Sequence, residues 1–108
     1  MRELLAHHLE QGGYRVLVAE DAVVAGRYVL ETPPDLMILD MEMPYMNGID
    51  FLRLLRDDPT VPKFPVLALS AYGHYEDVVS LLGSRFLSKP IQVDAFLKAV
   101  RTALVNRP

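Results

Sequence analysis

The sequence predicts an α/β fold in which helices pack against a parallel sheet. Short apolar runs alternate with segments of helical spacing, and the connections between them are short. The alternation begins and ends with a helix, so we expect four strands and five helices. This pattern is typical of a layered, doubly wound domain with right-handed crossovers. A length of 108 residues, 51% apolar and 23% charged, fits a single domain over residues 1–108.

Four short apolar runs, each bounded by polar or turn residues, predict the strands. The runs are Val16–Ala19, Leu36–Leu39, Val66–Leu69 and Phe86–Leu87. Runs of this length and nearly continuous apolar character suit strands that are buried on both faces, as in a parallel sheet.

The helices are predicted from apolar residues at helical spacing and from residues that end helices. The clearest stripe consists of Val93, Phe96, Leu97, Val100 and Leu104. Met1, Leu5 and Leu9 form a similar stripe before two glycines, which suit a helix end. Pro33 and Pro34 end a helix over residues 22–31, because proline cannot continue the hydrogen-bond ladder. Two further helices are expected, one after Asn47-Gly48 and a short one over about residues 75–82.

The charge balance and the lack of cysteine exclude several function classes. Lys and Arg number 11 against 14 Asp and Glu, for a net charge of −3, so direct binding to nucleic acid is not expected. Without cysteine there is no disulfide framework, Cys-ligated zinc or thiol catalysis. The apolar runs are far shorter than the roughly 20 residues that cross a membrane. We therefore expect a cytoplasmic protein with no membrane partner.

Three of the predicted strands end in polar residues that together suit phosphoryl transfer. Asp40, Ser70 and Lys89 follow successive apolar runs. Ligands of parallel α/β sheets bind beyond the carboxyl ends of the strands. There a carboxylate would act as nucleophile, while a hydroxyl and an ammonium group stabilise phosphoryl oxygens, usually with a divalent metal. Each residue in isolation would more often be a helix cap, a turn residue or a solvated charge; the combination favours chemistry.

Three motifs carry these residues. They are Asp-Met-Glu-Met-Pro-Tyr-Met-Asn-Gly at 40–48, Leu-Ala-Leu-Ser-Ala at 67–71 and Phe-Leu-Ser-Lys-Pro-Ile at 86–91. In this order, and at these strand ends, they resemble the motifs of CheY-like receiver domains from response regulators, over essentially the whole chain. The resemblance implies a flavodoxin-like fold and a phosphoacceptor module of a two-component phosphorelay.

The resemblance also implies a role for each matching residue in the transfer. Asp40 would accept the phosphoryl group, Ser70 would donate a hydrogen bond to it, and Lys89 would pair with it. Ala71 would leave room for the donor. Mg²⁺ would bind to Asp40 and to the backbone carbonyl of Glu42.

Switching and partners follow from the same resemblance. Ser70 and Phe86 would be the switch residues, and Pro90 would follow a cis peptide bond. The phosphoryl donor would be a histidine kinase or a phosphotransfer protein. An output protein or effector domain would bind the face formed by the fourth helix, the fifth strand of the family and the fifth helix. The module would be a switch and not an enzyme.

The N-terminal end departs from the family pattern. The family's first strand and the acidic pair that closes it are absent, so we expect an N-terminally incomplete receiver domain whose Mg²⁺ site lacks two ligands. Three explanations are expected to compete. The chain would be an incomplete version of a longer polypeptide, or it would borrow a strand or form a homodimer through its exposed edges, or Tyr14–Ala19 would shift inward beside Leu36–Leu39. In the last case Glu20 and Asp21 would stand next to Asp40 as metal ligands.

Two alternative functions stay open at this point. The first is a receiver-like docking module that works without phosphorylation, because the absent acidic pair removes charge compensation for the transfer. The second is a phosphohydrolase resembling the haloacid dehalogenase superfamily, which also places Asp, Ser or Thr, and Lys at strand ends. That superfamily expects Asp-x-Asp, whereas Asp40-Met41-Glu42 carries Glu at the second acidic position.

Overall fold

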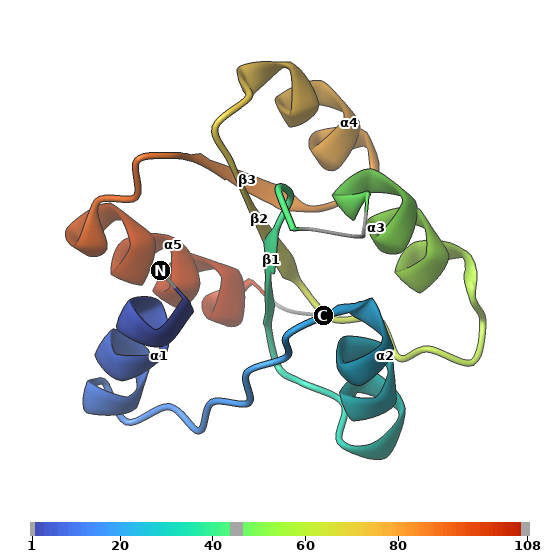
Figure 1. The fold of residues 1–108 in the computed structure, drawn as a ribbon, viewed down its shortest axis with the longest axis horizontal. Helices are drawn as coiled ribbons and strands as arrows, with labels where there is room; N and C mark the ends of the chain where they lie inside the picture. The colour runs from blue at the N-terminus through green and yellow to red at the C-terminus, as the bar shows by residue number, and fades with distance from the viewer. Residues whose placement is uncertain (1, 44–46, 107–108) are drawn as a thin grey trace.

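The computed structural model describes residues 2–43 and 47–106. Within them, three strands form one parallel sheet in the order β1-β2-β3. The strands are β1 (Met37–Asp40), β2 (Val66–Ser70) and β3 (Arg85–Ser88). The α-helices are α1 (Arg2–Gln11), α2 (Ala22–Glu31), α3 (Gly48–Asp57), α4 (Glu76–Leu81) and α5 (Val93–Val105), and a 3₁₀ turn, Gly73–Tyr75, leads into α4 (Figure 1). The predicted α/β class is confirmed.

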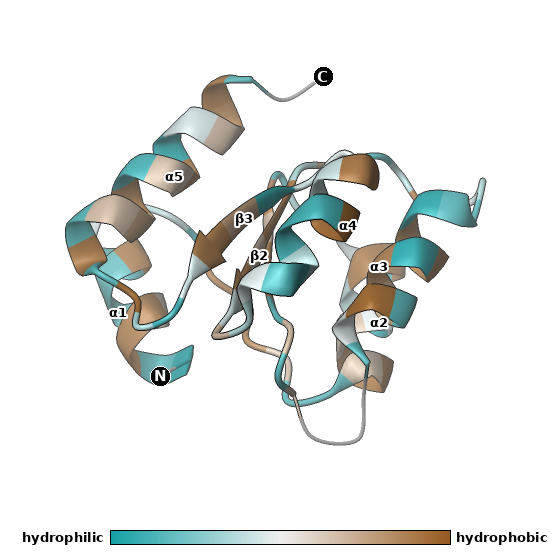
Figure 2. Cartoon of the chain, turned by 90° about the horizontal axis from the view of Figure 1, so that it is seen from above, coloured by the Kyte–Doolittle hydropathy of each residue, from teal (hydrophilic) through white to brown (hydrophobic). Residues whose placement is uncertain are grey.

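The helices lie in two layers because β2 is apolar on both of its faces. All five residues of β2 are buried. Val66 and Ala68 pack in the core that α2, α3 and α4 cover, whereas Leu67 and Leu69 pack against α1 and α5. Figure 2 shows the apolar strands between the two groups of helices. The continuous apolar run in the sequence therefore reflects burial on both sides of a parallel sheet.

Local capping fixes where two of the helices begin. The Oδ1 atom of Asp21 accepts a hydrogen bond from the Val24 N–H at 2.9 Å at the start of α2. The Oδ1 atom of Asn47 accepts one from the Ile49 N–H at 2.9 Å at the start of α3. Such caps satisfy N–H groups that have no partner within the helix. The predicted helix over residues 22–31 is confirmed.

One predicted strand is wrong. Residues 14–19 form no strand, so the described sheet has three strands where four were expected. Within the described chain, no backbone hydrogen bond joins residues 15–18 to another segment, and β1 pairs with β2 alone. An extended segment becomes a strand only beside a partner that accepts its hydrogen bonds, and this apolar run has none. The arrangement with Tyr14–Ala19 shifted inward against β1 is therefore not the one that the structure adopts.

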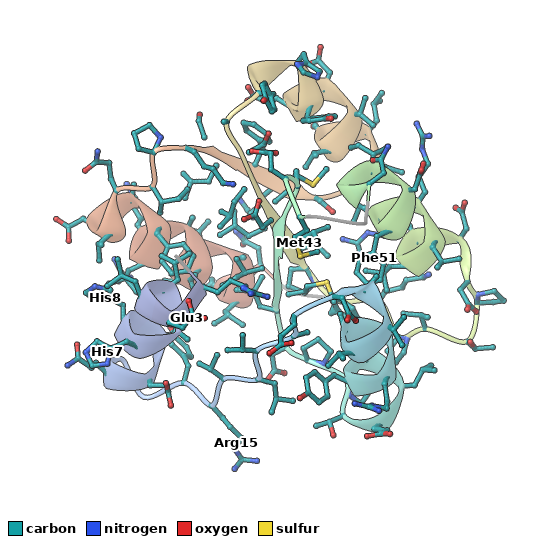
Figure 3. All side chains as sticks on the ribbon, in the orientation of Figure 1. Glu3, His7, His8, Arg15, Met43 and Phe51 are labelled. Atoms are coloured by element: carbon teal, nitrogen blue, oxygen red, sulfur yellow. The ribbon has the colours of Figure 1, made fainter. Side chains whose placement is uncertain are left out.

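An apolar cavity of about 630 Å³ borders the free edge of β1. Residues 14–19 and 36–40 line it together with residues of the surrounding helices, and Met43 and Phe51 lie beside it near the centre of the molecule (Figure 3). Among the residues of β1, Leu39 alone is buried, in contrast to the fully buried β2. The open edge thus leaves β1 less protected than its neighbour.

Arg56 links α3 to the segments that enter β2 and β3. Its guanidinium group donates hydrogen bonds to the Phe64 carbonyl at 2.7 Å, the Leu82 carbonyl at 3.1 Å and the Ser84 Oγ at 2.9 Å. The fixed fork of five N–H donors suits a site where three acceptors converge. Burial lowers the pKa of Arg56 from its ordinary value.

In the part of the chain that the structure describes, no helix combines the length and the apolar character needed to cross a membrane. The cytoplasmic location expected from the sequence stays a prediction.

Candidate functional site

The structure brings Asp40 and Lys89 into direct contact at the carboxyl edge of the sheet. The Nζ atom of Lys89 donates a hydrogen bond to the Oδ1 atom of Asp40 at 2.8 Å. Both side chains are 20% exposed, so the pair is partly desolvated yet reachable from solvent. The three residues expected to meet at this edge therefore include one preformed ion pair.

Parallel strand register places the three groups side by side. Asp40 pairs with Leu69 across β1 and β2, and Ser70 pairs with Ser88 across β2 and β3. The Lys89 N–H donates to the Ser70 carbonyl at 2.8 Å, which extends the ladder one residue beyond β3. The peptide bond between Lys89 and Pro90 is cis. The sheet itself thus sets the spacing of the site.

Ser70 lies at the buried end of the site. It is fully buried, and its Oγ accepts a hydrogen bond from the Tyr72 N–H at 2.9 Å. The same Oγ donates to the Oε2 atom of Glu42 at 2.7 Å. Glu42, and not Asp40, is therefore the carboxylate that the Ser70 hydroxyl contacts.

The carboxylate of Glu42 also contacts a backbone N–H group and the ammonium group of Lys89. Its Oε1 atom accepts a hydrogen bond from the Ala71 N–H at 2.6 Å and lies 3.4 Å from the Nζ of Lys89. From the sequence, only the backbone carbonyl of Glu42 was assigned a role, so this use of its side chain was missed. The sequence did contain a signal for this role. Glu42 is an acidic residue two positions after the end of a predicted strand, at the sheet edge where Ser70 and Lys89 were also expected.

Asp40 keeps one carboxylate oxygen free. Its Oδ1 atom accepts hydrogen bonds from the Glu42 N–H at 2.9 Å and from Lys89. These are the contacts of this carboxylate within the described residues, and none of them uses Oδ2. Oδ2 is therefore the oxygen available to an incoming electrophile or cation.

The charge of Lys89 is stabilised at this site. Partial burial would lower the pKa of its ammonium group, but the hydrogen bond to Asp40 and the charges of Asp40 and Glu42 outweigh that effect, and together they raise the pKa. Lys89 is thus protonated at neutral pH and supplies a fixed positive charge.

A close backbone approach fixes the loop that follows β1. A Cβ atom on Gly48 would lie 2.8 Å from the Sδ atom and 3.0 Å from the Cα atom of Met41. Glycine therefore lets the start of α3 pack directly against the residue after Asp40. Pro44, Tyr45 and Met46 of the first motif lie outside the described residues.

The proposed extra metal ligands do not join the site. Asp21 caps α2, and no group of three or more His, Cys, Asp or Glu side chains suited to a metal occurs among the described residues, so Glu20 and Asp21 make no such cluster with Asp40. The oxygen atoms that remain still suit Mg²⁺, which prefers hard oxygen ligands and usually keeps several waters. The oxygen atoms that would hold the ion are Oδ2 of Asp40 and the backbone carbonyl oxygen of Glu42.

Phe86 lies away from the polar contacts. It is partly buried and packs against the core that β2 shares with α3 and α4. On α4, Leu81 is 86% exposed. Phe86 is thus a partly buried residue of β3 that packs on the core to which α4 contributes Val79.

Comparisons with known proteins agree on one family. The sequence profile of the response regulator receiver domain matches residues 1–101. The transcriptional regulatory protein KdpE of Mycobacterium tuberculosis is 39% identical over 95 residues, which cover 85% of this chain and 41% of KdpE. The DNA-binding dual master transcriptional regulator RpaA of Synechocystis is 32% identical over 105 residues, which cover 94% of this chain and 44% of RpaA.

Solved structures agree with the sequence matches. The chemotaxis response regulator CheY4 of Vibrio cholerae superimposes with a TM-score of 0.84 at 26% identity, covering 95% of this chain and 88% of CheY4. The chain spans less than half the length of KdpE and RpaA, the curated regulators named above.

Proposed function

The chain belongs to the response regulator receiver domain family, and from this membership we propose that Asp40 is the residue that accepts the phosphoryl group. Receiver domains are signalling modules of two-component systems. The observation that carries the assignment to Asp40 is its contact with Lys89 at 2.8 Å, at a strand end where Oδ2 stays free. Neither a phosphohydrolase nor a docking module that works without phosphorylation is favoured by the matches, which are receiver domains.

The transfer itself needs little covalent chemistry from the protein. Oδ2 of Asp40 would attack the phosphorus atom of the donor, forming a P–O bond while the bond from phosphorus to the donor breaks. The electron pair of the broken bond leaves with the donor, and Asp40 becomes a mixed anhydride. Positioning and charge stabilisation account for most of the catalysis in such reactions.

The charge that arrives with the phosphoryl group would be shared by neighbouring donors. Lys89 supplies an ammonium group, Ser70 a hydroxyl and Ala71 a backbone N–H, all at the same edge of the sheet. Mg²⁺ held by Asp40 and the backbone carbonyl of Glu42 would offset further negative charge when bound.

A change of partner surface would follow from the same contacts. If Ser70 moves toward the phosphoryl group, Phe86 gains space and the face formed by α4, β3 and α5 changes. We expect an output protein or effector domain to read this face, and a histidine kinase or phosphotransfer protein to supply the phosphoryl group. The product stays attached to the chain, so the module acts as a switch and turns over no substrate.

Incubation with acetyl phosphate and MgCl₂ tests the proposal. The intact mass should increase by one phosphoryl group per chain, and hydroxylamine should remove the label, since it cleaves acyl phosphates. The variant Asp50→Asn, which changes an exposed carboxylate at the start of α3, should be labelled like the wild type. Sustained release of phosphate well beyond one equivalent would instead indicate a hydrolase, and no labelling would contradict the proposal.

A further inference from the structure

The carboxylate of Glu42 occupies a complete set of anion-binding groups. Ser70 Oγ donates to it at 2.7 Å, the Ala71 N–H donates to it at 2.6 Å, and the Lys89 Nζ lies 3.4 Å away. Hydroxyl, backbone amide and ammonium groups converging on one point form the donor set that stabilises oxyanions. In the structure these donors bind the side chain of Glu42, which belongs to the same chain.

The Ser70 hydroxyl and the Ala71 N–H cannot each serve two anions at once. A serine hydroxyl and a backbone N–H each carry a single hydrogen, and Glu42 is the nearest acceptor of both; the other acceptor of the Ser70 hydroxyl, the Tyr72 carbonyl, lies farther away at 3.4 Å. Lys89 is shared already, because its Nζ contacts Asp40 at 2.8 Å and Glu42 at 3.4 Å. A phosphoryl group on Asp40 would need the same donors for its oxygens.

The position of Glu42 in the chain keeps its carboxylate close to these donors. Glu42 lies two residues after Asp40, and its own N–H is bonded to Oδ1 of Asp40 at 2.9 Å. A group tethered so closely acts as if present at millimolar concentration or more. The side chain is nevertheless 24% exposed, so it has an open path to solvent.

We propose that Glu42 is an internal competitor for the phosphoryl site. With its carboxylate on Ser70, Ala71 and Lys89, the site is closed to phosphoryl oxygens; with the carboxylate in solvent, the site is open. This inference rests on the proposed role of Asp40 and adds the control of that same site. Glu42 acts here through the donors it occupies and takes no part in bond formation.

The first test compares phosphorylation rates. With acetyl phosphate and MgCl₂, Glu42→Ala should be labelled at least about tenfold faster than the wild type, because each lost hydrogen bond to a charged group is worth that factor or more. Glu42→Gln keeps an acceptor oxygen but loses the charge, so its rate should lie between the two. Glu31→Ala, which removes an exposed carboxylate at the end of α2, should leave the rate unchanged. A Glu42→Ala rate at or below that of the wild type would overturn the inference.

The second test does not depend on phosphorylation. Inorganic phosphate is titrated into both proteins, and the amide resonance of Ala71 is followed by NMR. In Glu42→Ala the resonance should respond at a phosphate concentration at least about tenfold lower than in the wild type. Equal responses, or no response in either protein, would reject Glu42 as a competitor.

The two tests together distinguish a failure of the acceptor role of Asp40 from a failure of the competitor role of Glu42. If neither protein is labelled but phosphate reaches Ala71 only in Glu42→Ala, the competitor stands and the acceptor role of Asp40 fails. If the wild type is labelled on Asp40 and the phosphate responses are equal, the acceptor role stands and the competitor fails.

Discussion

Replacing Asp40 with asparagine should abolish labelling by acetyl phosphate. The amide keeps the size of the side chain and an oxygen that can accept from the Glu42 N–H, but it cannot form a mixed anhydride with phosphorus. In this variant Lys89 loses its ion pair with Asp40 but keeps the one with Glu42, at 3.4 Å. Because Glu42 remains to pair with Lys89, the expected loss is that of one hydrogen bond, about 1 kcal/mol of the free energy of unfolding. The intact mass after incubation with MgCl₂ and acetyl phosphate measures the result.

Two comparisons make this result specific. Asp21→Asn removes the carboxylate that caps α2 and should still be labelled. That carboxylate lies at a helix end and does not belong to the site around Asp40. An urea titration of each variant shows that the fold is kept. If Asp40→Asn takes up a phosphoryl group as the wild type does, the acceptor lies elsewhere in the chain.

Replacing Phe96 with alanine should bring the domain close to unfolding. Phe96 is fully buried and packs with Leu5, Leu9 and Leu67 where α1 and α5 cover the sheet. Truncation of a buried phenylalanine costs roughly 3–5 kcal/mol, through lost transfer energy and the cavity that remains. A domain of this size has only about 5–15 kcal/mol in total. The free energy of unfolding, from urea titration followed by circular dichroism, should fall by that amount.

A matched change on the same helix controls for helix propensity. Val105 lies at the end of α5 and is 81% exposed, so Val105→Ala should change the free energy of unfolding by no more than about 0.5 kcal/mol. A cost below about 1 kcal/mol for Phe96→Ala would mean that α5 does not pack on the sheet as described.

Local signals in the sequence predicted most of the helices and strands. Pro33 and Pro34 set the end of α2, and the spacing from Val93 to Leu104 identified α5. The apolar run Val66–Leu69 predicted β2 because a run without alternation must be buried on both faces. These features depend on residues close in sequence, which is why the sequence alone reveals them.

The predicted strand at residues 14–19 failed for a reason that local sequence cannot show. Its apolar residues indicate partial burial, and Tyr14, Val16 and Ala19 are indeed half-buried. A strand also needs a neighbour to receive its backbone hydrogen bonds, and β1 pairs only with β2. Pairing is a property of the whole sheet, so the same run lines a cavity instead.

The site was predicted at the level of strand ends and missed at the level of contacts. The positions of Asp40, Ser70 and Lys89 follow from where three apolar runs end. The parallel register of the strands then places these ends side by side at one edge of the sheet. Which carboxylate reaches the Ser70 hydroxyl depends on the path of the loop after β1. That path, and not residue type, directs the Glu42 side chain onto Ser70 and Ala71.

Chemical trapping of the phosphorylated residue tests the central claim most directly. Reduction of an aspartyl phosphate with borohydride converts the side chain to that of homoserine, which peptide mapping by mass spectrometry can locate. After incubation with acetyl phosphate and MgCl₂, we expect homoserine at position 40 and at no other aspartate. Homoserine at Asp21, Asp50 or another position, or phosphate retained on Ser70, would contradict the account.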